Sequence, residues 1–176
     1  MKKYFPAAML LVFLTCAALA ASAQRDWKEY VYASDGFAIS APFQPTLQKE
    51  VKETPLGQVE THNYTMDMGN DTGVAVNATD FKLVQGVDAK LILEVTKAGI
   101  AESLHGRIVS EKEVSLGAAP GTQFDLETDA NHMRLRYFFI EGKLFALVSM
   151  APRAKPLAPE TDRIFDSFRL VAAGRR

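Results

Sequence analysis

The chain has 176 residues, of which 20 are lysine or arginine and 21 are aspartate or glutamate, so its formal net charge at pH 7 is −1. A nucleic-acid-binding protein needs a concentrated basic surface, and this balance argues against that class. The only cysteine is Cys16. The rest of the chain can therefore form neither a disulfide nor a thiolate metal site.

Residues 1–23 have the features of a secretory signal peptide. Two lysines precede an uncharged apolar run over residues 4–20, and small residues at 21–23 suit a signal peptidase. We expect cleavage before Gln24. The signal carries two lysines and no acidic residue, so its removal leaves one domain, residues 24–176, with a net charge of −3. This domain would be periplasmic or secreted and would have no membrane span.

Two alternatives to cleavage stay open. Uncharged residues continue to Gln24, so the segment could be retained as a membrane anchor, although Pro6 and the small-residue tail favour cleavage. Cys16 suggests a second hypothesis, that the segment contains a lipoprotein signal. The three residues before Cys16, however, lack the leucine-then-small pattern of such signals.

The first part of the mature chain predicts outer strands with one polar side. Asp35-Gly36 lies between two apolar stretches and predicts a tight hairpin. Residues 47–53 and 58–68 read as a second hairpin, and residues 74–81 as a further strand. One polar side is normal where an antiparallel sheet faces solvent.

One long helix follows. Asp88 is a good N-cap, and apolar residues then recur at three- and four-residue spacing up to His105. Gly106 is placed to adopt the left-handed conformation that ends a helix. The apolar stripe of this helix needs a sheet face on which to pack.

Three consecutive strands are predicted over residues 122–128, 133–140 and 143–150, where side chains alternate between apolar and polar or are apolar throughout. If Thr128 pairs with Met133, Leu126 lies opposite Leu135 and Phe124 opposite Tyr137. We call this apolar side face A and expect the long helix to cover it.

The opposite side of these strands, face B, is half charged and half apolar. The same register places Glu127 opposite Arg134 and Asp125 opposite Arg136. Phe138 and Phe145 continue face B toward its other end. A short helix that begins near residues 159–162, with Ile164, Phe165 and Phe168 on its apolar side, is expected to lie on or near this face.

These features resemble bacterial exported proteins of the Mog1/PsbP-like group. The residues that carry the resemblance are Trp27, the run Asp35-Gly36-Phe37-Ala38-Ile39-Ser40-Ala41-Pro42, the turn at Pro120-Gly121 and the closing Arg163-Ile164-Phe165-Asp166-Ser167-Phe168-Arg169. The resemblance implies an α+β fold, an antiparallel sheet between helices. It also implies a binding or assembly module rather than one class of enzyme.

No catalytic, cofactor or metal motif is recognisable. No serine lies in a Gly-x-Ser-x-Gly or Ser-x-x-Lys pattern. His62, His105 and His132 lie in separate segments without metal-ligand spacing. Glu60 and His62 share a strand face with Tyr64, which a solvated polar strand explains as well as a metal site does.

The most specific candidate site is therefore on face B. Its residues are Arg134, Arg136, Asp125, Glu127, Phe138 and Phe145. They form either a surface ladder of ion pairs, which is usually worth little, or two arginine forks that bind an anionic group or an acidic partner. The short C-terminal helix decides between these readings, because it would cover the phenylalanines.

The leading functional hypothesis is a non-catalytic binding or assembly module. An alternative is a carrier that holds a small amphipathic ligand between the sheet and the C-terminal helix, among Phe138, Phe145, Phe165 and Phe168. A third is an enzyme whose site joins one of the histidines to acidic residues.

Overall fold

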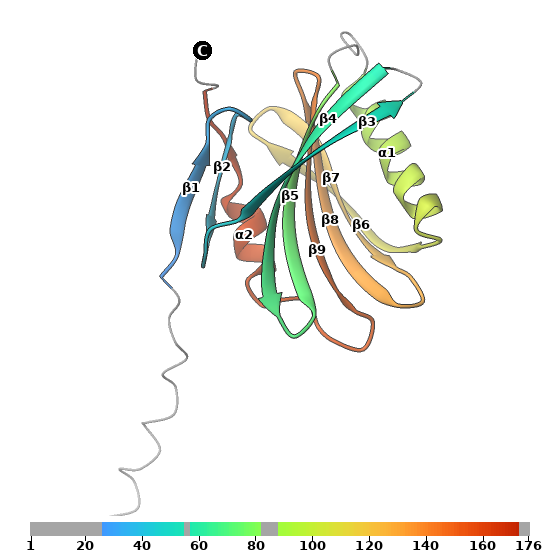
Figure 1. The fold of residues 1–176 in the computed structure, drawn as a ribbon. Helices are drawn as coiled ribbons and strands as arrows, with labels where there is room; N and C mark the ends of the chain where they lie inside the picture. Colours follow the sequence, from blue (N-terminus) through green and yellow to red (C-terminus); the bar gives the residue numbers. More distant parts are fainter. Residues whose placement is uncertain (1–25, 55–56, 82–87, 173–176) are drawn as a thin grey trace, which may run out of the picture.

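The computed structural model describes residues 26–54, 57–81 and 88–172, which form two antiparallel sheets and two helices (Figure 1). The large sheet has the strand order β3–β4–β5–β9–β8–β7–β6, and the small sheet the order β1–β2–β10. The predicted signal peptide lies outside the described residues. The α+β class predicted from the sequence is confirmed.

The strands of the large sheet are β3 (Thr46–Thr54), β4 (Gly57–Gly69), β5 (Thr72–Asp80), β6 (Arg107–Leu116), β7 (Ala119–Glu127), β8 (Asn131–Ile140) and β9 (Lys143–Pro152). The small sheet contains β1 (Lys28–Tyr32), β2 (Phe37–Ala41) and β10 (Arg169–Leu170). The helices are α1 (Ala89–Ser103) and α2 (Thr161–Ser167).

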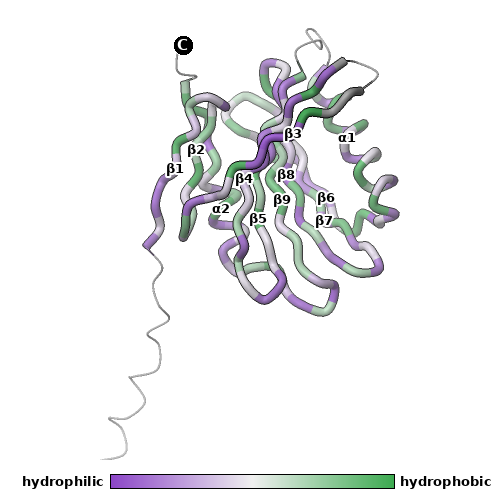
Figure 2. Tube along the Cα trace, viewed as in Figure 1, coloured by the Kyte–Doolittle hydropathy of each residue, from purple (hydrophilic) through white to green (hydrophobic). Residues whose placement is uncertain are grey.

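The two faces of the large sheet are buried under different layers. On face A, α1 packs on β7 and β8, and its Leu93 joins buried Phe124 and Leu135. On face B, Ile164 and Phe165 of α2 pack with the small sheet against β4, β5, β8 and β9. This is the predicted meander with the long helix on one face and the short helix on the other. Figure 2 shows hydrophobic residues along the central strands and mostly hydrophilic ones on β3.

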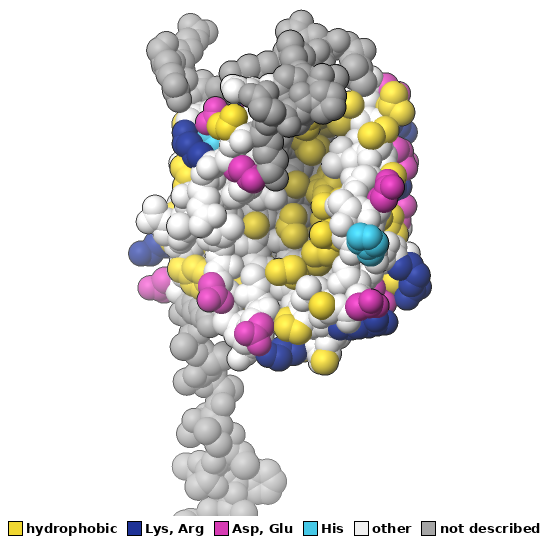
Figure 3. All heavy atoms as spheres, turned by 45° about the vertical axis from the view of Figure 1, so that its right-hand side comes forward, with side chains coloured by type: hydrophobic (Ala, Val, Ile, Leu, Met, Phe, Trp, Pro, Cys, Tyr) yellow, Lys and Arg dark blue, Asp and Glu magenta, His cyan; other side chains and the backbone are white. Residues whose placement is uncertain are grey.

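The cover on face A is incomplete. Leu93 is the only residue of α1 that is fully buried, whereas Leu91 and Val95 are exposed on the same helix. Met150, on face A of β9 opposite Met133, is also exposed. Figure 3 shows hydrophobic side chains gathered in a hollow on this side of the molecule.

The register between β7 and β8 differs from the predicted one by two residues. Thr128 is bonded to Asn131, because its N–H and hydroxyl donate to the carbonyl of Asn131 and its hydroxyl accepts from the N–H of Asn131. The turn therefore contains two residues, 129 and 130, between the paired positions. A pairing of Thr128 with Met133 would have left four residues there. A shift of two residues keeps every side chain on its predicted face.

The charged pairs of face B change with this register. Asp125 lies opposite Arg134, and Glu127 lies opposite His132. The predicted pairing of Glu127 with Arg134 is wrong, and so is that of Asp125 with Arg136, because Arg136 lies opposite Gln123.

The N-terminal hairpin forms a separate sheet, whereas the sequence suggested a single one. Its turn contains Asp35 and Gly36, as predicted, and Gly36 has a φ of 78°, which favours glycine. Pro42 and Pro45 follow β2, and a chain with two prolines in four residues cannot continue a ladder. β2 pairs instead with β1 and with the C-terminal β10.

Helix α1 begins as predicted and ends one residue differently. The Asp88 side chain accepts a hydrogen bond from the N–H of Lys90, as an N-cap does. His105 rather than Gly106 has the left-handed φ, at 51°. A Cβ on Gly106 would lie 2.6 Å from Cδ2 of Leu126, so glycine is needed there for close packing.

Two glycine substitutions should change stability in opposite directions. A Cβ on Gly121 would overlap the ring of Phe138 and lie 2.6 Å from the carbonyl oxygen of Tyr137, so we expect Gly121→Ala to lower the free energy of unfolding by about 1–3 kcal/mol. Gly99 lies in α1 with open space around it, so Gly99→Ala should raise that free energy by roughly 0.5–1 kcal/mol. Urea denaturation measures both, and equal effects would contradict the packing at Gly121.

Candidate functional site

The two arginines of the predicted site lie on β8 and contact acidic residues of α2. Arg134 donates from Nη1 to Oδ1 of Asp162 at 2.8 Å, and Nη1 of Arg136 lies 2.9 Å from Oδ1 of Asp166. Residues two apart on a strand are separated by roughly 6.6 Å, and residues four apart on a helix by roughly 6 Å along its axis. Because these spacings match, the four residues hold α2 along β8, and we call them the arginine clamp.

On the sheet side, the same arginines are bonded to β7. Arg134 binds Asp125 through two hydrogen bonds, from Nε to Oδ1 at 2.8 Å and from Nη2 to Oδ2 at 3.2 Å. Arg136 donates from Nε to Oε1 of Gln123 at 2.8 Å, and its guanidinium lies 5.4 Å from the centre of the Phe165 ring. Both guanidinium groups are thus bonded on two sides.

The hydrogen bonds keep this pair charged. Burial would raise the pKa of Asp125, but hydrogen bonds from Arg134 and Ser110 outweigh it and leave that pKa lowered. The hydrogen bond to Asp125 raises the pKa of Arg134. All three nitrogens of the Arg134 guanidinium face carboxylate oxygens, so an incoming anion would have to displace Asp125 or Asp162.

The phenylalanines of the predicted site lie beneath the C-terminal segment. Phe138 is 2% exposed and Phe145 is 3% exposed. The Phe168 ring stacks on Phe138 at 6.0 Å and lies 5.4 Å from the Phe145 ring. The site therefore does not bring the arginines together with an exposed aromatic patch, because Phe168 fills that space.

A cleft opens beside the arginine clamp. Its volume is about 540 Å³, and it lies between one end of β6, β7 and β8 and the loop that leads into α2. Its charged and polar lining includes Asp125, Glu127 and Arg134, three of the six predicted site residues, together with His132 and Asp162. Its apolar lining is Val109, Leu126, Met133, Leu157, Ala158 and Pro159.

Ion pairs surround the rim of this cleft. Oε2 of Glu127 lies 3.1 Å from Nη2 of Arg107 and 3.6 Å from Nη2 of Arg153. With the bonds from Arg134 to Asp125 and Asp162, each carboxylate of the rim has a cationic partner. The rim is therefore charged but nearly balanced, and the lining between its ion pairs is apolar.

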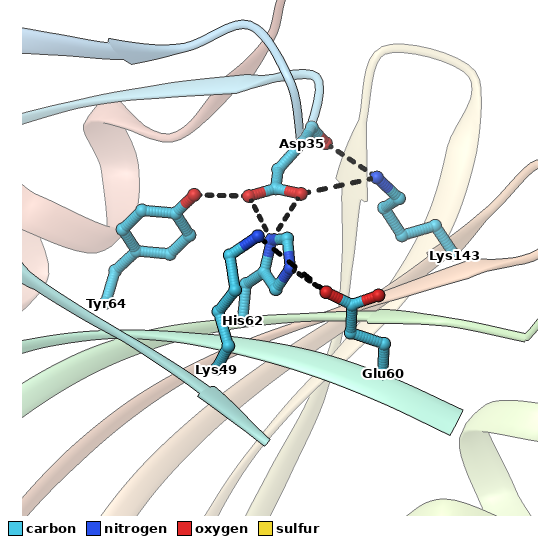
Figure 4. A network of polar contacts seen from close by, with 6 residues as sticks. All are labelled: Asp35, Lys49, Glu60, His62, Tyr64 and Lys143. Atoms are coloured by element: carbon cyan, nitrogen blue, oxygen red, sulfur yellow. Dashed lines mark hydrogen bonds and ion pairs between the residues drawn. The ribbon is translucent and has the colours of Figure 1, made fainter. Parts of the chain in front are cut away.

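A second polar network joins the small sheet to the large one (Figure 4). Asp35, in the turn between β1 and β2, is only 5% exposed. Its carboxylate accepts from the hydroxyl of Tyr64 on β4, and both its oxygens lie 2.8 Å from Nδ1 of His62. Nζ of Lys143 on β9 donates to the Asp35 carbonyl at 3.1 Å. The turn is thereby fixed to two strands of the large sheet.

The imidazole of His62 lies between two carboxylates. Its Nε2 is 2.7 Å from Oε1 of Glu60, whose carboxylate is also 3.8 Å from Nζ of Lys49. Burial lowers the pKa of His62, but the hydrogen bonds to Asp35 and Glu60 outweigh it and raise that pKa. Burial and the hydrogen bond to Asp35 also raise the pKa of Tyr64. With both ring nitrogens bonded to carboxylates, His62 has none free to take a proton from a substrate.

The sequence indicates only part of this network. It places Glu60, His62 and Tyr64 on one strand face but indicates Asp35 as a turn residue alone. No local signal reports a contact between a turn and a strand 27 residues later. Among the described residues, no group of three or more His, Cys, Asp or Glu could hold a metal ion.

Comparison with known proteins gives matches in structure. No protein-family model matches the chain, and no curated protein sequence matches it. The solution structure of cyanobacterial PsbP (CyanoP) from Synechocystis sp. PCC 6803 matches with a TM-score of 0.54 and 10% sequence identity, over 88% of this chain and 98% of that one.

The fold is PsbP-like. A protein of unknown function from Pseudomonas aeruginosa matches 60% of this chain and 84% of its own, with 7% identity and a TM-score of 0.40, too low to bear on the fold. The Mog1/PsbP-like architecture expected from the sequence is thus observed. In the described part of the PsbP-like domain, no helix has both the length and the apolar character needed to cross a membrane.

The His62 network should make the stability of the PsbP-like domain depend on pH. Because the pKa of His62 is raised above its ordinary value of 6.5, the folded state binds the proton more tightly than the unfolded state does. The stabilisation is complete below pH 6.5 and is lost as the pH rises through the raised pKa. We expect the difference in unfolding free energy between the wild type and His62→Gln to shrink as the pH rises from about 6 to 9.

Denaturant titrations at a series of pH values measure this difference. Glu60→Gln is the matched control, because it removes one of the two carboxylates and keeps the contact of Nδ1 with Asp35. It should retain part of the dependence. A difference between the wild type and His62→Gln that does not change with pH would contradict a protonated His62.

Proposed function

We propose that the mature chain is an exported, non-catalytic binding module that holds a segment of a protein partner in the cleft beside the arginine clamp. The cleft itself carries the proposal. Its volume of about 540 Å³ falls within the usual range of ligand sites, and such sites combine an apolar lining with a few polar groups that orient the ligand. The signal-like residues 1–23 support a place of action outside the cytoplasm, in the periplasm or the medium.

A peptide segment fits this cleft better than a single anion does. Every nitrogen of Arg134 is already bonded to a carboxylate, so a free anion gains little there. A partner's charged side chains can instead exchange with the ion pairs of the rim, because exposed pairs contribute only about 0–1 kcal/mol each. Asp162 is the carboxylate best placed to leave its ion pair and bind a charged side chain of the partner. Its side chain is well exposed, and Arg134 remains bonded to Asp125 without it.

The PsbP-like fold supports the same reading, because the resemblance noted above implies binding and assembly modules. A carrier of an amphipathic ligand between sheet and helix is less favoured, because the Phe168 ring packs on both Phe138 and Phe145 and fills that space. An enzyme built around His62 is less favoured, because both its ring nitrogens are bonded to carboxylates.

Two matched variants of α2 test the proposal. Asp162 and Asp166 lie one turn apart, each bonded to one arginine, and their side chains are 65% and 69% exposed. Only Asp162 lines the cleft. We expect Asp162→Asn to reduce partner capture by up to about fivefold, the effect of losing one exposed ion pair, and Asp166→Asn to leave it unchanged, while each lowers the unfolding free energy by no more than about 1 kcal/mol.

The measurement is affinity capture from an envelope extract of the source cell, with the captured proteins quantified by mass spectrometry. The wild type, Asp162→Asn and Asp166→Asn are compared at equal amounts of folded protein. Identical capture profiles for the two variants would contradict the proposal that the partner binds in this cleft. A wild type that captures nothing above the bare resin would sink the binding function.

A further inference from the structure

Strand β3 is an open edge of the large sheet. It ends the strand order in which β4 is its neighbour (Figure 1), and among the described residues no other strand pairs with it. Its register with β4 runs from Thr46 to Thr54 without a bulge. An unpaired, regular edge strand offers a row of backbone donors and acceptors to another strand.

The hairpin geometry tells which backbone groups face outward. Thr54 lies opposite Gly57 across a two-residue connection, and such a hairpin closes with a hydrogen-bonded pair. Bonded pairs recur at every second residue of an antiparallel ladder. Even-numbered residues of β3 therefore bond to β4, and the N–H and C=O groups of Leu47, Lys49 and Val51 point away from the sheet.

The order of charges along this edge is self-complementary. The sequence from residue 49 is Lys49-Glu50-Val51-Lys52-Glu53. When the strand is paired antiparallel with its own copy about Val51, Lys49 stands opposite Glu53, Glu50 opposite Lys52 and Val51 opposite Val51. All four charged positions of each strand then meet the opposite charge.

Neighbouring registers fail this test. Because the outward groups lie on alternate residues, a two-fold pairing must be centred on a residue. Centres at Lys49, Glu50, Lys52 or Glu53 place that residue opposite its own copy, so that like charges face each other across the pair. Among centres within the charged run from Lys49 to Glu53, only Val51 avoids this, and it also sets every charge opposite its complement, so the charges favour that register.

We infer that β3 pairs antiparallel with β3 of a second copy of this chain, about a two-fold axis at Val51. Such a contact is isologous, so it closes on two copies and does not propagate. It joins the two seven-stranded sheets through their β3 edges. The Val51 side chain, which is 58% exposed in the single chain, would pack against its copy at the axis.

The other edge of the sheet lacks these features. The register of β6 with β7 is interrupted between Ile108 and Ser110, and a bulge of this kind protects an edge from pairing. Its charges run Glu111-Lys112-Glu113, so a pairing about Lys112 sets lysine against lysine and glutamate against glutamate. The contrast assigns the self-contact to β3. The cleft of the proposed function lies at the β6–β8 side of the sheet, so the two proposals stand independently.

Charge-swapped variants test the contact. Lys49→Glu with Lys52→Glu makes the edge wholly acidic, and Glu50→Lys with Glu53→Lys makes it wholly basic. We expect the wild type to sediment with twice the mass of one chain and each variant alone with the mass of one chain. An equimolar mixture of the two variants should again give twice the mass, because every position then meets the opposite charge.

The control is Lys112→Glu on β6, which should leave the wild-type mass unchanged. Restored association in the mixture also establishes that both variants are folded. The inference is overturned if the wild type stays monomeric at the highest concentration at which it is soluble. It is equally overturned if either variant alone associates as the wild type does, or if the mixture fails to associate.

Discussion

The fold depends on one constraint: strands β8 and β9 carry apolar residues on both faces, and both faces must be covered. Consecutive residues Tyr137, Phe138 and Phe139 of β8 are buried, and so are Leu144, Phe145, Ala146 and Leu147 of β9. Successive residues of a strand point to opposite faces, so neither face can be left in water. With a buried leucine or phenylalanine worth roughly 1.5–3 kcal/mol, two covering layers are required, and the chain supplies α1 for one and α2 with the small sheet for the other.

Polar contacts fix the layer on face B in position at two places. The arginine clamp aligns α2 along β8, and the Asp35 network attaches the turn of the small sheet to β4 and β9. Beside the clamp, the hydroxyl groups of Ser149, which lies opposite Arg134 on β9, and of Thr161 are buried and bonded at 2.8 Å. Apolar packing sets how much area is buried but is not directional, so these bonds define where the layer lies.

The sequence was enough to predict which face of the sheet each side chain of the central strands lies on. Alternation placed Leu135 and Tyr137 on the apolar side and Arg134 and Arg136 on the other, because the period of two is a local property. The predicted partners of β7 residues on β8 were wrong by two residues. The apolar pattern cannot detect such a shift, since it leaves each side chain on the same face, and the bonds of Thr128 with Asn131 decide it.

The candidate site was predictable in part for the same reason. Asp125, Glu127 and Arg134 do line one cleft, because neighbours on one face of adjacent strands stay together in either register. The loop that completes the cleft, and the contact of Asp35 with His62, join segments far apart in the chain. Phe138 and Phe145 looked available only because the position of Phe168 is a tertiary property that no local pattern contains.

The small sheet closes around both ends of the described chain. β2 pairs with β10, so that Ala38 lies opposite Arg169 and Phe37 opposite Leu170, and the Phe168 ring stacks on Phe37 at 5.5 Å. A polypeptide that leaves a ribosome or a translocation channel N-terminus first cannot make these contacts until its last residues emerge. Tyr32 and Phe37 can pack on Tyr64 of β4 earlier, but the contacts with β10 and Phe168 join residues about 130 positions apart, and contacts of such sequence separation form slowly. The small sheet can therefore be completed only when synthesis or transport is complete, and until then the first hairpin is a two-stranded ribbon with one edge of β2 unpaired.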